Sequence, residues 1–353
     1  MLKSKSLLLI GGSKGNAHLL NYRNLIEDCF DDILIVSNQE SEQFPSRKVN
    51  FELKNPFAMW KNVQILRKII QEEQPDIIHV HQANAYGFIT ALANRGRRPL
   101  VVTTWGSDVL TLPHTSFLHR WMVQYILRSA DAITADAQFM ADAIHGLIGQ
   151  VPVTVANFGV EIQNIEEGKE RKNIIYSNRM HESLYQIDQI ILQLAPFLSK
   201  NPEWKLRIAA SGSQTENLQN LAKENLPDGS FEFLGFQAGK DNQQNYLQSK
   251  VYVSIPTTDG TSISLLESLA YGCLPIVSDL PANREWIQDG VNGIISSGDL
   301  SKDVERLLQL DASSIQERNK EIIDQKATKN ANRKKFTAIY EVIFSGAAFK
   351  AKK

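Results

Sequence analysis

Short apolar runs alternate with amphipathic stretches along the first half of the chain. Such runs are typical of buried strands in a parallel sheet, and the stretch from Phe57 to Glu73 between two of them repeats its apolar residues at helical spacing. The strands that we expect are 7–10, 33–36, 77–81, 100–104 and 151–155. Alternating strands and helices predict an α/β domain with a parallel sheet.

The second half of the chain repeats this pattern. We expect strands at 173–177, 206–210, 231–234, 251–255 and 274–278, with helices at 187–198 and 216–224. The stretch from Ile165 to Lys172 is charged and poor in apolar residues, so we place the domain boundary there. The expected domains are residues 1–164 and 173–325, followed by a helical segment with a basic tail at 326–353.

The stretch from Val251 to Gly272 predicts a strand, a polar turn and a helix beginning near Ser262. The first amides of a helix lack partners and carry partial positive charge, so Ser262, Ile263 and Ser264 are suited to hold a phosphate. Asp259 and Glu267 would then lie on either side, where carboxylates bind sugar hydroxyls. The alternative is that Asp259 and Ser262 only cap the helix.

Composition excludes several classes of protein. The chain of 353 residues has a net charge of −1, which gives no electrostatic case for nucleic-acid binding. Its cysteines, Cys29 and Cys273, predict neither a disulfide framework nor a zinc site. The apolar run near the N-terminus ends at Gly11, too short for a signal peptide, and no run approaches the length of a membrane span. We therefore expect a cytoplasmic protein.

Two motifs suggest cofactors and are set aside. The turn at Gly11 and Gly12 lacks the spacing of a dinucleotide fingerprint, which disfavours NAD. His79 and His81 share a strand face, but no further ligands lie nearby in the sequence, so we expect a packed pair and assign no metal.

The stretch from Asp259 to Gly272 resembles the nucleotide-sugar motif of glycosyltransferase family 4. In that family an acidic residue binds the donor sugar, turn amides hold the diphosphate, and a glutamate holds the ribose. By position these are Asp259, Ser262 to Ser264, and Glu267, with Asp259 replacing the usual glutamate. The resemblance implies the GT-B fold: α/β, with two facing Rossmann-like domains and a C-terminal helix crossing back to the first.

The resemblance also implies other donor residues. Arg179 follows the first strand of the second half, where a cation can meet a diphosphate. The family has a lysine a few residues later, but this chain has Leu184 or Tyr185 there. Gly12 would approach the donor phosphate, and the turns that contain Gly212 and Phe236 would line the nucleotide.

On the acceptor side the resemblance points to His81, Trp105 and Asp108. The family often has His-Gly-x-Asp after the strand that here ends at Thr104, and Trp105 replaces that histidine. Asp108 is retained, either to cap the following segment or to position or deprotonate the acceptor hydroxyl.

The implied enzyme is a retaining hexosyltransferase that needs no metal or cofactor. It would move a sugar from a UDP- or GDP-sugar to a glycan or lipid-linked acceptor, in the synthesis of bacterial surface polysaccharide or glycoconjugate. The alternatives are a nucleotide-sugar epimerase and a non-catalytic sugar-nucleotide binder. The basic tail at 349–353 gives a further alternative, peripheral contact with the inner face of the membrane.

Overall fold

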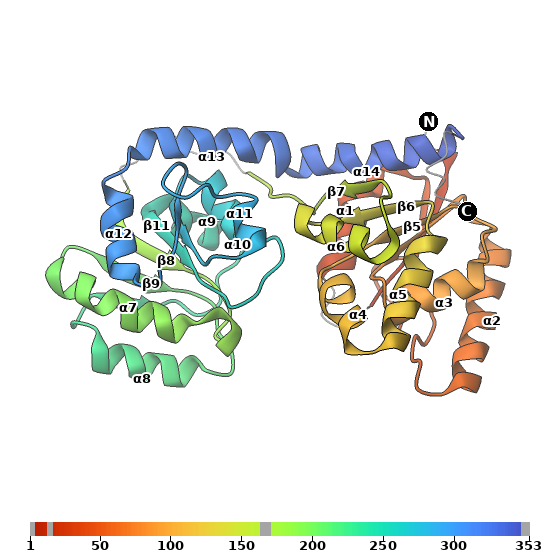
Figure 1. Ribbon diagram of the computed structural model, residues 1–353, viewed down its shortest axis with the longest axis horizontal. Coiled ribbons are helices and arrows are strands. Elements are labelled where there is room, and N and C mark those ends of the chain that lie inside the picture. The colour runs from red at the N-terminus through yellow and green to blue at the C-terminus, as the bar shows by residue number, and fades with distance from the viewer. Residues whose placement is uncertain (1–3, 13–16, 163–170, 347–353) are drawn as a thin grey trace. The chain divides into compact units, whose positions relative to one another are not determined.

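A computed structural model describes residues 4–12, 17–162 and 171–346 of the chain, and it divides into two compact units. Unit 1 comprises residues 1–158 and 332–353, and unit 2 comprises residues 159–331. Each unit is a parallel sheet with helices packed against it (Figure 1). These two α/β units confirm the expected fold class. Most of the expected boundary at 165–172 lies outside the described residues.

Unit 1 is built on a seven-stranded parallel sheet with the order β3-β2-β1-β4-β5-β6-β7. Its elements are β1 (Ser6–Ile10), α1 (Ala17–Ile26), η2 (Glu27–Cys29), β2 (Asp32–Ser37), β3 (Ser46–Lys48), α2 (Pro56–Glu73), β4 (Ile77–His81), α3 (Ala85–Asn94), β5 (Leu100–Thr103), η3 (Ser107–Thr111), α4 (Leu112–Thr115), α5 (Phe117–Ser129), β6 (Ala132–Ala135), α6 (Gln138–Ile148), β7 (Val153–Val155) and α14 (Lys329–Phe344), which begins at the end of unit 2.

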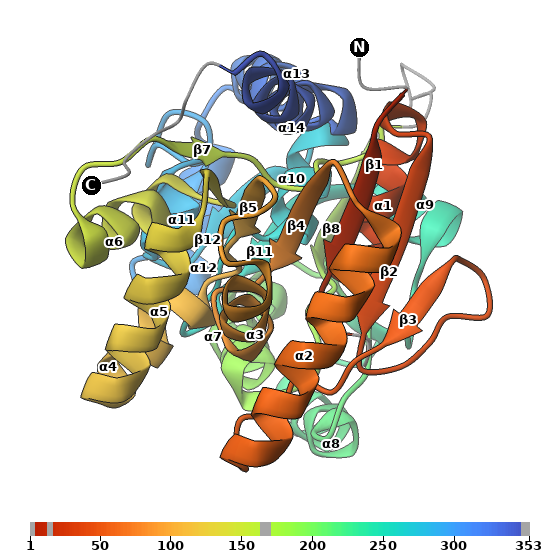
Figure 2. The same ribbon diagram turned by 90° about the vertical axis from the view of Figure 1, so that its right-hand side faces the viewer.

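The strands of unit 1 are apolar on both faces, which is why they appear as continuous apolar runs. Leu8 and Ile10 pack under α2, α3, α5 and α6, whereas Leu7 and Leu9 pack under α1 and α14. Figures 1 and 2 show α14 on the opposite side of this sheet from α2, α3 and α5. The last helix of the chain therefore completes the core of the first unit.

A buried polar chain joins α14 to the sheet. The Tyr340 hydroxyl lies 2.7 Å from Nδ1 of His79, whose Nε2 lies 2.6 Å from Oγ1 of Thr103. Burial, with a smaller effect of His81, holds the pKa of His79 well below its usual value, so the ring is neutral. Both ring nitrogens have partners, as expected for a packed histidine.

Unit 2 is built on a six-stranded parallel sheet with the order β10-β9-β8-β11-β12-β13. Its elements are β8 (Lys172–Ser177), η4 (Ser183–Tyr185), α7 (Ile187–Lys200), β9 (Lys205–Ile208), α8 (Thr215–Asn225), β10 (Phe231–Phe233), α9 (Gly239–Gln248), β11 (Ser249–Ser254), α10 (Ile263–Ala270), β12 (Leu274–Val277), α11 (Pro281–Arg284), β13 (Ile294–Ile295), α12 (Leu300–Leu308) and α13 (Ala312–Lys326).

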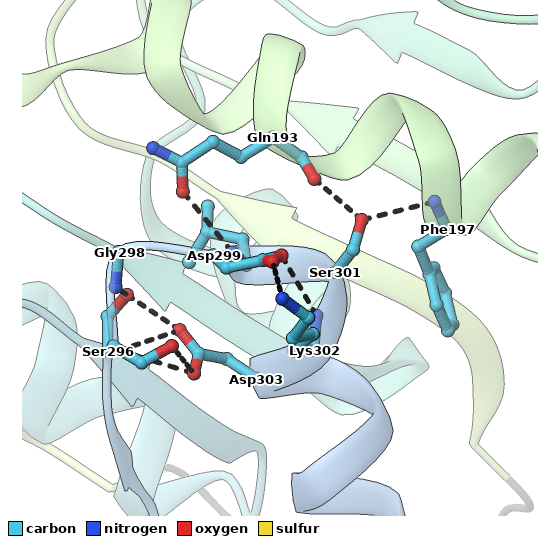
Figure 3. A network of polar contacts seen from close by, with 10 residues as sticks. Gln193, Phe197, Ser296, Gly298, Asp299, Ser301, Lys302 and Asp303 are labelled. Carbon is cyan, nitrogen blue, oxygen red and sulfur yellow. Dashed lines mark hydrogen bonds and ion pairs between the residues drawn. The ribbon is translucent and has the colours of Figure 1, made fainter.

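Helix α7 contains Pro196 and stays packed because α12 repairs its hydrogen bonding. Proline interrupts a helical ladder, and at this point a serine hydroxyl enters it. Ser301 Oγ donates to the carbonyl of Gln193 at 2.6 Å and accepts the N–H of Phe197 at 3.1 Å (Figure 3). The carboxylate of Asp303 holds the loop before α12 by accepting from the Ser296 hydroxyl at 2.7 Å. Because α12 also packs against β12, this network joins α7 and α12 in one layer over the sheet.

Candidate functional site

The site is built around the beginning of α10, which follows β11 after a polar turn as the sequence predicts. Ser262 is the N-cap residue, and its Oγ accepts the N–H of Leu265 at 3.3 Å. The helical ladder begins with the N–H of Leu266, which donates to the Ser262 carbonyl at 3.1 Å. The amides of Ile263 and Ser264 therefore lie at the open end of the helix, where an anion is favoured.

Arg179 lies beside this helix start. Its Nη1 donates to Ser262 Oγ, and its Nη2 contacts Oδ2 of Asp259 at 2.7 Å. Arg179 is 8% exposed, and its guanidinium lies 4.4 Å from the centroid of the Tyr185 ring. Burial opposes its charge, but Tyr252, Asp259 and Tyr185 outweigh burial and raise the pKa of Arg179. A charged guanidinium and the helix amides thus converge on one corner.

Asp259 approaches the same corner from the loop before α10. Its Oδ1 accepts the N–H of Gly260 at 3.0 Å, and its side chain is 20% exposed, more than that of Arg179. The sequence places Asp259 and Arg179 80 positions apart. Their contact brings together the residues expected at the donor sugar and at the diphosphate.

Glu267 lies one turn inside α10 and is held by α9. Its Oε2 accepts from the Tyr246 hydroxyl at 3.0 Å and from Nδ2 of Asn242 at 3.3 Å. Burial raises the pKa of Glu267, and these two hydrogen bonds only partly oppose it. The carboxylate is therefore fixed in direction rather than free in solvent.

Further polar groups support this carboxylate and were not foreseen from the sequence. Asn178 Nδ2 donates to the Tyr246 hydroxyl at 2.7 Å and to Oδ1 of Asn242 at 3.1 Å. The hydroxyl of Tyr176 donates to the same Asn242 oxygen at 2.7 Å, and that of Tyr252 donates to Oδ1 of Asn178 at 3.3 Å. Burial raises the pKa of Tyr252 to about 12, so its phenol is neutral. The one hint in the sequence is the i, i+4 spacing of Asn242 and Tyr246.

The loops after β9 and β10 are tied together at the same edge of the sheet. The N–H of Ala210 donates to the Gly235 carbonyl at 2.7 Å. A Cβ on Gly212 would lie 2.6 Å from the His181 carbonyl oxygen, so only glycine fits this close approach. Phe236 is 76% exposed, which leaves its ring available for stacking.

The position expected to hold a second cation is occupied differently. Tyr185 lies against Arg179, whereas Leu184 is 38% exposed and its carbonyl accepts the N–H of Thr257 at 2.9 Å. The missing lysine is therefore replaced by an aromatic contact, which orients the guanidinium without adding charge.

In unit 1, the carboxylate of Asp108 is surrounded by backbone donors. Oδ2 accepts the N–H of Ala83 at 2.7 Å, and Oδ1 accepts that of Trp105 at 3.0 Å. Burial raises the pKa of Asp108 even though these hydrogen bonds lower it, and the residue is 2% exposed. This geometry favours the capping alternative, because both oxygens hold the loops after β4 and β5.

The other residues expected on the acceptor side form an aromatic stack. The His81 ring is buried 4.5 Å from that of Tyr22 and 5.5 Å from that of Trp105, and Trp105 lies 4.6 Å from Phe158. Gly12 is half-buried after β1, and residues 13–16, the rest of its turn, lie outside the described residues. His81 is therefore buried among aromatic rings, and Trp105 keeps one part of its surface exposed.

The described residues contain neither a metal-ligand cluster nor a membrane-spanning helix. No three His, Cys, Asp or Glu side chains in the described ranges are grouped so that they could hold a metal ion. No helix in the same ranges combines the length and the hydropathy needed to cross a membrane.

Comparison with known proteins identifies the family. The model of the glycosyl transferase 4-like family matches residues 7–137, and that of glycosyl transferases group 1 matches residues 159–329. An uncharacterized glycosyltransferase of Methanocaldococcus jannaschii is 22% identical over 301 residues, 83% of this chain and 79% of the relative. The GDP-mannose:cellobiosyl-diphosphopolyprenol alpha-mannosyltransferase of Xanthomonas oryzae is 22% identical over 64% of this chain and 61% of its own length.

Solved structures agree on the fold. The crystal structure of Anabaena HepE in complex with UDP has a TM-score of 0.78 at 17% identity, and the match covers 97% of this chain and all of that one. At this identity the likeness concerns the fold alone. Together with the two family models, which leave little of the chain unmatched, it shows that the chain belongs to the family 4-like glycosyltransferases of the GT-B fold.

Proposed function

We propose that this glycosyltransferase retains the configuration of a sugar that it takes from a nucleoside diphosphate sugar. The observation that carries the proposal is the convergence of Arg179, Ser262 and Asp259 at the beginning of α10, with Glu267 one turn further along. A diphosphate on this corner would meet a guanidinium and two helix amides. Carboxylates would flank it on both sides.

In the proposed reaction the bond between the sugar and the diphosphate breaks, and negative charge grows on the leaving group. Arg179 and the amides of Ile263 and Ser264 would stabilise that charge electrostatically. Asp259 would accept hydrogen bonds from the hydroxyls of the donor sugar, and Glu267 those of the ribose. The acceptor hydroxyl would attack from the face of the leaving group, and its proton would pass to the departing diphosphate oxygen as the new glycosidic bond forms, with no carboxylate nucleophile and no metal or cofactor.

The ligands named for two related proteins support a proposal for the donor and the acceptor. HepE was crystallised with UDP, and the Xanthomonas relative is named for GDP-mannose and a diphosphopolyprenol acceptor. We infer a UDP- or GDP-sugar donor and a glycan or lipid-linked acceptor. The protein would act from the cytoplasm at the inner face of the membrane, in bacterial surface polysaccharide or glycoconjugate synthesis. The nucleobase would lie against the loops of Gly212 and Phe236.

A second candidate function is sugar-nucleotide binding without transfer. It is favoured by Tyr185 and Leu184, which fill the position of the second phosphate-binding cation, and by Trp105 in place of histidine. A nucleotide-sugar epimerase of the same fold is a third candidate function, because it would need a donor site but no acceptor site.

A screen of sugar nucleotides by thermal shift tests the proposal, because a ligand that binds only the folded state raises its melting temperature. The best donor is then incubated with the protein, with and without lipid-linked and soluble glycan acceptors. Transfer with retention supports the proposal. Conversion of the donor without acceptor identifies an epimerase, binding without turnover identifies a non-catalytic binder, and no shift with any donor contradicts the site assignment.

A further inference from the structure

Unit 1 exposes large apolar side chains at the beginnings of two helices. A folded protein normally shows such residues singly, whereas here they gather in the first turns of α2 and α5. Their exposed fractions are Phe57 90%, Trp60 46%, Phe117 85%, Leu118 68% and Trp121 47%. None of them belongs to the donor site in unit 2.

On α2 the exposed residues share one face. Asn55 caps the helix through its side chain, and Phe57, Trp60 and Lys61 follow at i, i+3 and i+4. The buried side of α2 faces the sheet through other positions, such as Val63. The first turns of α2 therefore present two aromatic rings and one ammonium group to solvent.

Helix α5 repeats the arrangement. Phe117, Arg120 and Trp121 are exposed at i, i+3 and i+4, directly after the N-cap residue Ser116. Trp121 also lies 6.0 Å from the ring of Phe88, in the first turn of α3. Two helices that flank α3 thus begin with the same combination of aromatic and cationic residues.

These helix beginnings lie at one edge of unit 1. Helix α3 follows β4 and α5 follows β5, and in a parallel sheet such connecting helices run back against the strands. Helix α2 leads into β4 in the same way and packs against α3, which in turn packs against α5. Their first turns consequently lie at the edge where the strands end. We call the exposed residues of these turns the docking face: Phe57, Trp60, Lys61, Phe117, Leu118, Arg120 and Trp121.

Charge is segregated in the same part of the chain. Residues 53–130 contain nine Lys and Arg residues and four acidic residues, although the whole chain has a net charge of −1. Two of the four acids, Glu72 and Glu73, end α2 far from the docking face, and Asp108 is buried. Of these cations, Lys61 and Arg120 lie in the exposed first turns beside the aromatic rings, whereas Arg95, Arg97, Arg98 and Arg128 lie at the opposite ends of α3 and α5.

We propose that the docking face binds the surface of an anionic lipid bilayer. Rings of Phe and Trp insert at the level of the headgroups, and lysine and arginine beside them pair with lipid phosphates. This inference rests on the proposed function only for its purpose, which is to bring the enzyme to a lipid-linked acceptor. It places the contact on folded helices of unit 1 rather than on the basic tail at 349–353.

Two other occupants fit the observations less well. A second copy of the chain would bring together two faces that each carry Lys61 and Arg120 and no exposed carboxylate among the residues named for the docking face, so it offers these cations no partner. A soluble polyanion would pair with the cations but would leave the rings of Phe57 and Phe117 exposed to water. A bilayer satisfies both the charge and the apolar surface.

The test uses the full-length protein and flotation with vesicles. The wild type should float with vesicles of phosphatidylcholine mixed with phosphatidylglycerol, and much less with phosphatidylcholine alone. Lys61→Gln and Arg120→Gln should each weaken binding about fivefold, as expected for one cation at an anionic surface. Phe57→Ser combined with Phe117→Ser should abolish flotation, and added salt should weaken the binding of the wild type.

Matched substitutions in unit 2, Leu308→Ser and Lys320→Gln, also remove an exposed leucine and an exposed lysine and should leave flotation unchanged. Thermal unfolding of every variant shows that the fold is retained. The flotation assay needs no sugar nucleotide. The proposed function can therefore fail while membrane binding by the docking face is confirmed, and membrane binding can fail while the proposed function is confirmed.

Several outcomes would overturn the proposal. They are equal binding to neutral vesicles, no binding to either kind, binding to heparin but not to vesicles, and loss of flotation on deletion of residues 347–353 with no effect of the docking-face variants.

Discussion

The carboxylates that the sequence singles out in the two units have different surroundings. In unit 2, Asp259 contacts a guanidinium and keeps part of its surface exposed, and Glu267 accepts hydrogen bonds from two side chains. In unit 1, both oxygens of Asp108 accept backbone N–H groups, and the residue is almost fully buried. A ligand could replace partners of Asp259 and Glu267, whereas Asp108 holds two loops in place.

The difference shows what a polar residue at the end of a parallel strand does in each case. A carboxylate whose partners are flexible side chains can exchange them for ligand hydroxyls at little cost. A carboxylate whose partners are backbone amides cannot leave without exposing unsatisfied N–H groups, which costs about 1–3 kcal/mol each. We therefore propose ligand binding for Asp259 and Glu267 and loop support for Asp108.

The largest expected effect is the loss of donor affinity when Arg179 is replaced by alanine. The substitution removes the cation next to the diphosphate and leaves Asp259 without its cationic partner, so affinity should fall about 30-fold or more. Isothermal calorimetry with the best sugar nucleotide measures this effect. Arg207→Ala is the matched control, because Arg207 pairs with Glu232 at 2.6 Å in the same unit and its other printed partners, Asn245 and Gln248, lie on α9 rather than on α10.

Arg207→Ala should lower stability and leave donor affinity within a few-fold of the wild type. If the two arginine variants bind the donor equally well, the contrast between a ligand-binding pair and a structural pair is wrong.

The positions of the proposed donor residues on one continuous stretch could be predicted from the sequence because the strand, turn and helix that present them are local. Ser262 caps α10, and Glu267 follows one turn later, as helical periodicity requires. The partners of Glu267 could not be predicted, because Asn178 and Tyr246 reach it from other elements through tertiary packing.

In unit 1 the same reasoning from strand ends located His81 and Asp108 but not their roles. The position of a residue at a strand end follows from periodicity, whereas burial depends on which side chains pack over it. Tyr22 and Tyr340, contributed by α1 and α14, cover the sheet beside His81 and His79. The sequence around these histidines does not predict that helices from opposite ends of the chain pack over them.

A smaller effect is expected from removing one tyrosine hydroxyl in each unit. Tyr246→Phe removes a donor to Glu267, and Tyr340→Phe removes the partner of His79 Nδ1. Each should lower the free energy of unfolding by about 1–3 kcal/mol, since a buried polar group loses its partner. Only Tyr246→Phe should also weaken donor binding, by about fivefold, because Glu267 would lose part of its orientation.

Chemical denaturation and calorimetry on both variants separate the two effects. Equal donor affinities in Tyr246→Phe and Tyr340→Phe would mean that the support of Glu267 does not matter for binding. A loss of affinity in Tyr340→Phe would show that the core of unit 1 reaches the donor site.

The smallest effect is a pH dependence of donor affinity, which we expect from the carboxylate of Glu267 in unit 2. Ribose hydroxyls donate to an ionised carboxylate, and burial raises the pKa of Glu267 above that of an exposed glutamate. As the pH falls from neutral, Glu267 therefore takes up a proton earlier than an ordinary glutamate, and donor affinity declines by at most about tenfold per pH unit below that pKa.

The ligand for this measurement should be a nucleotide sugar rather than a nucleoside diphosphate, because the terminal phosphate of a nucleoside diphosphate itself titrates. Glu267→Gln should bind more weakly at neutral pH and show a flat profile, and a profile in this variant parallel to that of the wild type would assign the titration to another group, such as His181, whose pKa is lowered by burial.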